Sequence, residues 1–380
     1  MSVAIVPCSN LMPSMMVATL GIALPEIRQT FSLSTVAAGS MFSVMMIIAA
    51  LTSAVAGRLA DRIGRKTVLI TGLSLLALGF GVAGAAAHPV LFFIFLAVTG
   101  VGYGFTPPSL YALMSDLLPN RRGLGASLVS VTYGIGGAIG AVLASRIIAA
   151  SGWRAAFVTV GIIAAADMLL QLYWIRDTHR VRAAGRSGSF RDALSLPLFI
   201  LALAEFVGGS VFWSSAAWTP TALREAKALT LGETGWVMGA LSIANMLGSF
   251  SLGSLSDRFG RKRVIAWSAF PAAAAAFVLF YWLESPTSLA VGIFVFGVLK
   301  ASVPALVVAL AQEAAPPGSA GTASGVIMSL HYSAGVVAPL ISAQILAASG
   351  DILLAMIMAT SAPLVLYGFL IAAVRERRGL

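Results

Sequence analysis

Long apolar runs follow one another along almost the whole chain, and they constrain its fold more than any other feature. Of the 380 residues, 59% are hydrophobic and only 10% are charged, too few charges to cover the exterior of a soluble domain of this size. About 20 apolar residues cross the roughly 30 Å of hydrocarbon in a bilayer, and only helices or closed barrels satisfy their backbone groups there. Because the runs are continuous rather than alternating, they predict membrane-spanning helices.

The runs divide into twelve predicted spans. A polar stretch rich in Arg, Gly and Ser, residues 176–193, separates six spans from six and predicts a cytoplasmic linker. We therefore expect one six-helix bundle over residues 1–175 and a second over residues 194–380. The expected spans are 4–25, 36–57, 67–87, 91–117, 124–149, 154–175, 195–220, 233–254, 264–283, 288–312, 321–348 and 352–374.

The net charge of +10 is distributed by side of the membrane. With both chain ends in the cytoplasm, the predicted inner loops and tail hold 18 of the 24 Lys and Arg residues, and the predicted outer loops hold 4. This asymmetry follows the positive-inside rule and predicts a multi-pass protein of the inner (cytoplasmic) membrane with both termini cytoplasmic. The excess of Lys and Arg therefore reflects the orientation of the chain in the membrane. We expect the lipid bilayer as a partner and no nucleic acid.

One short basic motif occurs twice, in two loops that each connect a pair of predicted spans. The first copy is Gly57-Arg58-Leu59-Ala60-Asp61-Arg62-Ile63-Gly64-Arg65-Lys66, and the second begins 196 residues later and is Gly253-Ser254-Leu255-Ser256-Asp257-Arg258-Phe259-Gly260-Arg261-Lys262. Segments around Gly100 and Ser145 match segments 197 and 198 residues further on. Nearly constant offsets over this length indicate one six-helix unit present twice.

The duplicated pattern G-x-x-x-D-R-x-G-R-K resembles the loop signature of the major facilitator superfamily of secondary transporters. The resemblance extends over essentially the whole chain. It implies an all-α membrane protein with twelve transmembrane helices in two six-helix bundles related by pseudo-two-fold symmetry. It also implies rocker-switch alternating access around a substrate near the midplane, with spans one, four, seven and ten lining the cavity. We expect the protein to function as a monomer.

The resemblance further implies that the two motif loops form a cytoplasmic gate, which closes in the outward-open state and breaks during inward opening. We expect Arg62 to contact Asp116, and we expect Asp257 and Arg258 to face Glu313; ordinary positive-inside loop charge is the alternative. Asp61 would cap a helix N-terminus, where the helix dipole favours a carboxylate. The predicted gate motif comprises Gly57, Asp61, Arg62, Gly64, Arg65, Asp116, Gly253, Asp257, Arg258, Gly260, Arg261 and Glu313.

Lys300 is the clearest candidate for substrate binding, because ionisable side chains inside a span are costly and mark functional sites by default. It lies midway through the tenth predicted span, at the position that the first half fills with Tyr103. A buried ammonium needs an anion, and two are available: a substrate carboxylate, or Glu205 in the seventh span. We favour a role in substrate binding or coupling, and a purely structural Lys300–Glu205 pair is the alternative.

Glu205 and His331 are the candidates for proton coupling. Burial and a neighbouring Lys act in opposite directions on the ionisation of a carboxylate, and a group balanced between them would carry a coupling proton. A permanently ionised partner of Lys300 is an equally weighted alternative for Glu205. His331 takes the place of Tyr133 in the repeat, and we favour a hydrogen-bonded packing role for it over a proton shuttle.

Polar and aromatic residues elsewhere in the spans complete the predicted cavity. Arg146, near the outer end of the fifth span, would either attract anions at the outer mouth or extend its charge to the interface. Trp218 is expected to be an interfacial belt residue. The remaining substrate-binding candidates are Tyr103, Thr106, Trp213 and Asn245.

The chain departs from the proton-coupled drug exporters of the superfamily at three positions. Leu96 replaces an Arg, Ala141 replaces the Pro of G-x-x-x-G-P, and Met16 replaces an Asp found in one branch. We therefore predict a secondary active transporter of a small organic anion, a carboxylate; proton symport through Glu205 is one expected mode, and anion exchange and uniport are open alternatives. An exporter of drugs or amphipathic metabolites is the runner-up, and a non-transporting membrane sensor is a distant alternative.

No enzymatic constellation is recognisable in the sequence. Paired carboxylates, Ser/His pairs and metal-ligand clusters at one depth are missing, as is a Walker motif for nucleotide-driven pumping. The single cysteine, Cys8, allows neither an internal disulfide nor a cysteine metal site. We expect no enzyme activity, no cofactor and no bound metal.

Overall fold

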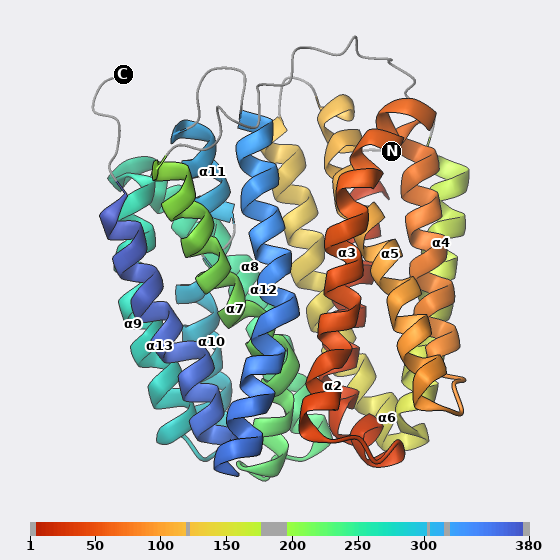
Figure 1. The fold of residues 1–380 in the computed structure, drawn as a ribbon, viewed down its shortest axis with the longest axis vertical. Helices are drawn as coiled ribbons and strands as arrows, with labels where there is room; N and C mark the ends of the chain where they lie inside the picture. Colours follow the sequence, from red (N-terminus) through yellow and green to blue (C-terminus); the bar gives the residue numbers. More distant parts are fainter. Residues whose placement is uncertain (1–4, 119–121, 176–195, 302–304, 315–319, 375–380) are drawn as a thin grey trace.

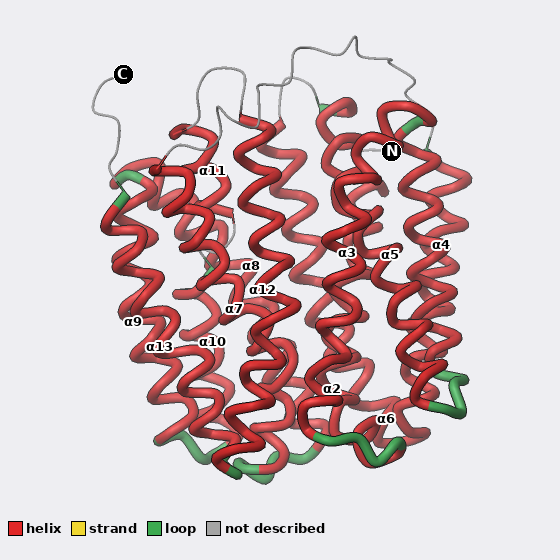
Figure 2. Tube along the Cα trace, viewed as in Figure 1, coloured by secondary structure: helices red, strands yellow, loops and turns green. Residues whose placement is uncertain are grey.

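A computed structural model describes residues 5–118, 122–175, 196–301, 305–314 and 320–374, and within these ranges the chain consists of helices joined by loops (Figures 1 and 2). Ten of the described helices are long and apolar enough to cross a membrane. The predicted all-α membrane fold is therefore confirmed. The predicted linker, residues 176–193, lies outside the described residues.

The helices of the first half account for six spans. Its longest helix bends at Gly152, whose backbone angles of φ 81° and ψ 168° are not helical, so this helix contains the predicted fifth and sixth spans. The elements are η1 (Val6–Asn10), α2 (Leu11–Thr30), α3 (Thr35–Ile63), α4 (Arg65–Ala83), α5 (Pro89–Leu117) and α6 (Arg122–Trp174).

The helices of the second half follow the same order, with one difference from the sequence prediction. The tenth span was expected to be continuous over 288–312, but one helix ends at Lys300 and the next begins at Ala305. The elements are α7 (Leu196–Glu225), α8 (Leu231–Phe259), α9 (Arg261–Tyr281), α10 (Pro286–Lys300), α11 (Ala305–Ala314), α12 (Ala320–Ser349) and α13 (Ile352–Ala373).

The two motif loops are single-residue turns between helices. Gly64 separates α3 from α4 with φ 101°, and Gly260 separates α8 from α9 with φ 88°. These positive φ values are readily adopted only by glycine. The backbone conformation of the turn therefore requires glycine at this position of the motif. The residue after the glycine, Arg65 or Arg261, begins the following helix.

The two halves lie side by side and contact each other mainly through α2 with α7, α3 with α12, and α6 with α8 (Figure 1). At the end of the bundle where α2 and α7 finish, the Glu26 carboxylate lies 2.6 Å from the Arg224 guanidinium. This ion pair joins the first half to the second.

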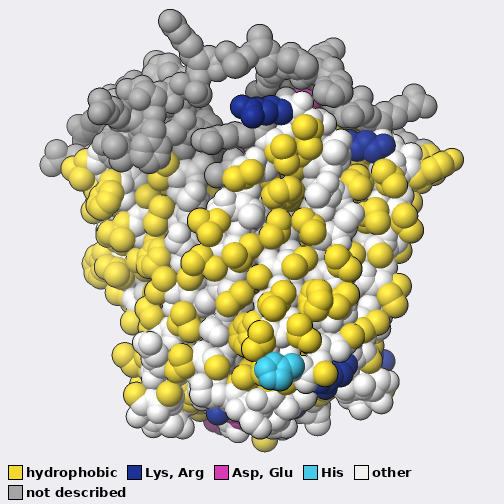
Figure 3. Space-filling view, turned by 45° about the vertical axis from the view of Figure 1, so that its right-hand side comes forward, with side chains coloured by type: hydrophobic (Ala, Val, Ile, Leu, Met, Phe, Trp, Pro, Cys, Tyr) yellow, Lys and Arg dark blue, Asp and Glu magenta, His cyan; other side chains and the backbone are white. Residues whose placement is uncertain are grey.

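The outer surface of the bundle is apolar. Large hydrophobic side chains such as Leu51, Ile162 and Phe369 are more than 60% exposed. Figure 3 shows hydrophobic side chains across the middle of one face, with Lys and Arg side chains near its two ends. An apolar belt of this extent is typical of a surface covered by lipid.

Candidate substrate-binding site

Lys300 is the last residue of α10, and its side chain is only 6% exposed. Its ammonium nitrogen lies 5.0 Å from the ring centroid of Phe212 on α7 and 5.6 Å from that of Phe296. Both distances allow a cation–π interaction. Within the described ranges Lys300 forms no ion pair, so aromatic faces are the only charge-stabilising contacts described for this ammonium.

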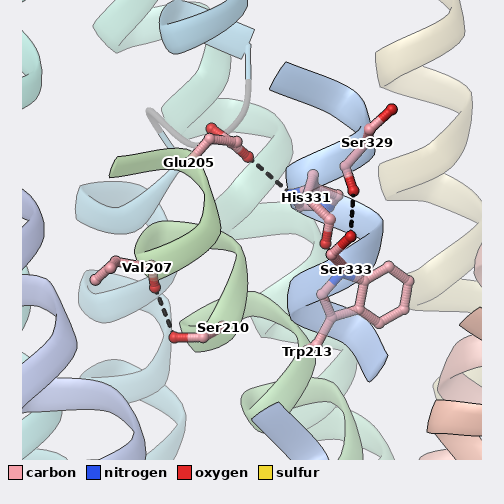
Figure 4. Close-up of polar contacts among 7 residues, drawn as sticks. All are labelled: Glu205, Val207, Ser210, Trp213, Ser329, His331 and Ser333. Carbon is pink, nitrogen blue, oxygen red and sulfur yellow. Dashed lines mark hydrogen bonds and ion pairs between the residues drawn. The ribbon is translucent and has the colours of Figure 1, made fainter. Parts of the chain in front are cut away.

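Glu205 on α7 and His331 on α12 form a buried pair, in which Oε1 of Glu205 lies 2.8 Å from Nδ1 of His331 (Figure 4). The side chains are 0% and 7% exposed. The second carboxylate oxygen, Oε2, has no hydrogen-bond partner among the described residues. The alternative of a Glu205–Lys300 pair is therefore corrected: the ion-pair partner of Glu205 is the histidine, which α12 brings against α7.

Helix packing explains why the imidazole reaches this carboxylate. A Cβ atom at Gly209, one turn after Glu205, would lie 3.0 Å from Nδ1 of His331, so a larger residue there would require the ring or its helix to shift. The indole N–H of Trp213, a further turn along α7, donates to the backbone carbonyl of His331 at 3.0 Å. One face of α7 therefore positions both the ring and the backbone of His331.

Tyrosine side chains from both halves meet beside this pair. The hydroxyl of Tyr103 on α5 lies 3.2 Å from the hydroxyl of Tyr133 on α6. The Tyr103 ring also contacts Trp213 and Tyr332 of the second half, with 6.3 Å between ring centroids in each case. Phe212 in turn contacts Trp213 and His331, with centroids 5.1 and 5.6 Å apart. Aromatic rings therefore connect Lys300 to Tyr103 across the interface between the halves.

Four residues that the sequence singled out form no described contact with the cluster around Lys300, Glu205 and His331 or are buried differently from the prediction. The Thr106 hydroxyl donates to the Gly102 carbonyl and faces Gly72 of α4, so Thr106 packs within the first half. Asn245 is half-buried on α8, and Arg146 is exposed on α6. The expectation for Trp218 was wrong: its side chain is 1% exposed, and its indole N–H donates to the Pro339 carbonyl, because α12 covers this face of α7.

The motif loops form ion pairs with the predicted acids but through a different arginine. Arg65, not Arg62, pairs with Asp116, and Arg62 is exposed. In the second half Arg261, not Arg258, pairs with Glu313 at 2.6 Å and lies 3.8 Å from Asp257.

The reason is that the glycine turn ends one helix and makes the arginine after it the first residue of the next. Gly57 and the side chain of Asp61 lie outside the described residues, whereas Gly253 is half-buried on α8.

Sequence reasoning missed the aromatic residues that connect the site. Phe212 and Tyr332 are adjacent in the chain to Trp213 and His331, but aromatic residues are common in membrane spans and carry no charge signal. Tyr133 was noticed only as the repeat counterpart of His331. The spacing of the repeat was the available signal, since it aligns Tyr133 with His331 and Tyr103 with Lys300.

The fold and the site together define a polytopic helical membrane protein with a polar centre between two repeated halves, the architecture of a secondary transporter. The family model of the Major Facilitator Superfamily matches residues 8–339. The chain therefore belongs to the Major Facilitator Superfamily of secondary transporters.

The chain is similar to three curated relatives over part of their length. It is 26% identical to a gallate transporter of Pseudomonas putida over 66% of this chain and 64% of that one, so the match spans less than two thirds of that relative. It is 28% identical to a gentisate transporter of Corynebacterium glutamicum over 84% and 75% of the two chains. It is 29% identical to the multidrug resistance protein MdtL of Shewanella oneidensis over 68% and 67%.

A solved structure supports the fold. The crystal structure of a D-xylose–proton symporter superposes with a TM-score of 0.83, covering 98% of this chain and 97% of that chain, at 16% sequence identity. At this identity the likeness concerns the fold alone.

Proposed function

We propose that this protein carries a small organic anion, a carboxylate, across the membrane, and that Lys300 binds the anionic group. The observation that carries the proposal is a buried ammonium that forms no ion pair among the described residues. Removing a charge from water is costly unless an opposite charge compensates for it. A substrate carboxylate at Lys300 would supply that charge, at a residue inside the membrane where ionisable groups mark function.

Among carboxylates we favour aromatic acids. Gallate and gentisate, the substrates named for two relatives, are benzoic acids with ring hydroxyl groups. The rings of Phe212 and Trp213 connect Lys300 to the ring of Tyr103 in the opposite half, and aromatic rings stack well on other rings. Asn245 and Arg146 are peripheral candidates, the latter as a long-range attractor of anions at the outer mouth.

We further propose that Glu205 and His331 bind the coupling proton as a unit. The two side chains share one short contact in a buried site, so a proton added to the pair changes its net charge by one where water does not screen it. Phe212 touches both the His331 ring and the Lys300 ammonium. A change of charge at the Glu205–His331 pair would therefore alter anion binding at Lys300, which is separated from the pair by the ring of Phe212. Symport requires such a coupling between proton binding and substrate binding.

Alternating access in this proposal moves two bodies, residues 1–175 and 194–380, past each other around the central site. The Glu26–Arg224 pair would hold the outer side closed, and the pairs of Arg65 and Arg261 would stabilise the loops of the cytoplasmic side. We place the protein in the inner membrane with both termini cytoplasmic, and we propose that it works as a monomer.

Export of drugs or amphipathic metabolites is the second candidate function. The similarity to a multidrug resistance protein favours it. So do the methionines buried in α2 and α3, because flexible thioether side chains tolerate varied ligands. The ligand would then be a hydrophobic cation rather than a carboxylate.

Thermal stabilisation of the purified protein by a ligand panel distinguishes these functions. The panel contains mono- and dicarboxylates, aromatic acids, sugars, amino acids and cationic dyes, each at two pH values. We expect stabilisation by aromatic carboxylates that is lost in Lys300→Met and kept in Lys227→Met, because Lys227 pairs with the mostly exposed Glu284 away from the site. Stabilisation by cationic dyes alone would overturn the anion proposal in favour of the exporter.

A further inference from the structure

The two halves place different chemistry at equivalent positions of the repeat. Lys300 of the second half occupies the position of Tyr103, 197 residues earlier, and His331 occupies the position of Tyr133, 198 residues earlier. The scaffold is therefore repeated, but the side chains that it turns to the centre are charged or titratable in the second half and phenolic in the first.

The phenolic side retains hydrogen-bonding capacity. The Tyr103 and Tyr133 hydroxyls lie 3.2 Å apart, so one donates to the other. Each hydroxyl offers one donor and accepts up to two hydrogen bonds. A single mutual bond leaves one donor and several lone pairs unused, and Tyr103 is only 3% exposed, so bulk water is not a ready partner for them.

Aromatic rings lie between the two sides. The Tyr103 ring lies 6.3 Å from Trp213 and 6.3 Å from Tyr332, both of the second half. On the other side, Phe212 lies between Trp213 and the Lys300 ammonium, with centroid distances of 5.1 and 5.0 Å. A planar ligand between these rings would have a cation at one end and phenols at the other.

We infer that Tyr103 and Tyr133 determine specificity by binding a ring hydroxyl of the substrate at the end opposite its carboxylate. The substrate would then lie with its carboxylate toward Lys300 and its hydroxyl toward α5 and α6. This inference rests on the proposed function, and it adds an orientation and a distinction between hydroxylated and unsubstituted aromatic acids. The competing explanation is that the tyrosine pair only joins α5 to α6.

Equilibrium binding of three probes to the purified full chain tests the inference. The probes are benzoate, 4-hydroxybenzoate and 4-methylbenzoate, which share the carboxylate and differ in the group opposite to it. We expect 4-hydroxybenzoate to bind about tenfold more tightly than the other two, because a hydrogen bond is formed in a buried site that would otherwise leave polar groups unpaired.

Tyrosine-to-phenylalanine variants give the decisive comparison. Each of Tyr103→Phe and Tyr133→Phe should lower the preference for 4-hydroxybenzoate several-fold, and the double variant should bring it within about twofold of 4-methylbenzoate. Binding of benzoate should change less than about twofold. Tyr281→Phe is the matched control, because Tyr281 is 59% exposed on α9.

The outcomes separate this inference from the function on which it rests. Equal affinity for the three acids in the unaltered protein, or a preference that survives the double variant, would overturn the inference and leave the anion carrier standing. A parallel loss of all three acids in the tyrosine variants would assign the pair a structural role and overturn it as well. Failure of the unaltered protein to bind any of the acids would overturn the inference together with the proposal that the substrate is an aromatic acid.

Discussion

At the scale of single residues, Glu205 and His331 are unusual because both are titratable and both are buried. The carboxylate is 0% exposed and keeps one oxygen without a partner among the described residues. A charged carboxylate in this position destabilises the folded state, because one contact does not compensate for the desolvation of the charge. Such a cost suggests that the residue is kept for a functional reason. Proton coupling gives the pair such a role, and it can be tested separately from substrate binding.

Glu205→Gln should abolish proton-driven accumulation of substrate while leaving exchange of substrate across the membrane largely intact. Glutamine keeps the shape and can still hydrogen-bond His331, but it cannot release or bind a proton at neutral pH. In proteoliposomes we expect exchange of labelled substrate to continue within a fewfold of the unaltered rate, while accumulation driven by an inwardly directed proton gradient falls to the level without a gradient.

Asp167→Asn is the control for that experiment. Asp167 is also a buried carboxylate, but its contact is with Gln171 on the same helix at 3.1 Å. Accumulation should remain gradient-dependent in this variant. Gradient-driven accumulation that persists in Glu205→Gln would remove Glu205 from the coupling proposal.

Gly209 should be intolerant of even one added carbon. A Cβ there would lie 3.0 Å from Nδ1 and 3.4 Å from Cα of His331, so Gly209→Ala forces α12 or the imidazole to move. Overpacking of this kind costs about 1–3 kcal/mol. We expect a lower unfolding temperature and weakened proton coupling. The matched control is Gly232→Ala on α8, where an added Cβ meets nothing within 4 Å; equal effects of the two substitutions would contradict the packing argument.

At the scale of the elements, the motif loops show how far the sequence determines a contact. The duplication correctly indicated that a basic residue of each loop meets an acid, Asp116 or Glu313. It could not distinguish between arginines three residues apart, because that choice depends on where the glycine turn ends one helix. Arg65 and Arg261 begin α4 and α9, so their side chains reach the acids, whereas Arg62 and Arg258 end the preceding helices and are exposed.

The two arginines of the first loop should therefore differ in their effect on transport. Arg65→Gln removes the pair with Asp116, and we expect the initial transport rate to fall about tenfold, the scale of a typical coupling between two conformational states. Arg62→Gln, the matched neutralisation of an exposed charge, should change the rate less than about threefold. A larger effect of Arg62→Gln would restore the pairing expected from the sequence.

The tenth span shows a limit of hydropathy patterns. Apolar residues continue past Lys300, so the run predicted one helix, but the structure describes a helix end at Lys300; residues 302–304 lie outside the described residues, and α11 is described from Ala305. Hydropathy reports which residues suit the bilayer interior, and it does not report where backbone hydrogen bonds are interrupted inside a protein that covers them. The interruption matters because it follows the residue on which the anion proposal depends.

At the scale of the whole molecule, one ion pair connects the halves among the described residues. Glu26 at the end of α2 and Arg224 at the end of α7 are joined at 2.6 Å, with side chains only 23% and 24% exposed. An ion pair that forms in one arrangement of the halves and breaks in another shifts the balance between the two arrangements by its own free energy. In the proposed orientation, this pair favours closure of the outer side.

Neutralising Glu26 should shift the protein toward outer opening. In Glu26→Gln we expect faster labelling of an introduced outer-cavity cysteine by a membrane-impermeant thiol reagent, in a background that lacks Cys8. The charge-exchanged protein Glu26→Arg with Arg224→Glu should restore slow labelling, whereas either exchange alone should not. Unchanged labelling in Glu26→Gln and in both single exchanges would show that the pair has no influence on the equilibrium of the two states.

The sequence predicted the architecture of the whole molecule better than its centre. Apolar runs follow from the bilayer, and the repeat is visible in the sequence as nearly constant offsets between matching segments. The centre depends on which side chains meet across helices distant in the chain. Lys300 was identified because a charge in a span is rare, whereas Phe212 and Tyr332 were missed because aromatic residues in spans are ordinary.

In the proposed function, the charge of Lys300 binds the carboxylate of an aromatic acid. The most direct measurement compares the dissociation constants of 4-hydroxybenzoate and of 4-hydroxybenzamide, its uncharged analogue, for the unaltered protein and Lys300→Met. We predict that the unaltered protein binds the acid at least about tenfold more tightly than the amide, and that this preference disappears in Lys300→Met, because about 1.4 kcal/mol of charge interaction corresponds to each tenfold. A preference for the acid that survives the loss of the ammonium would contradict the claim.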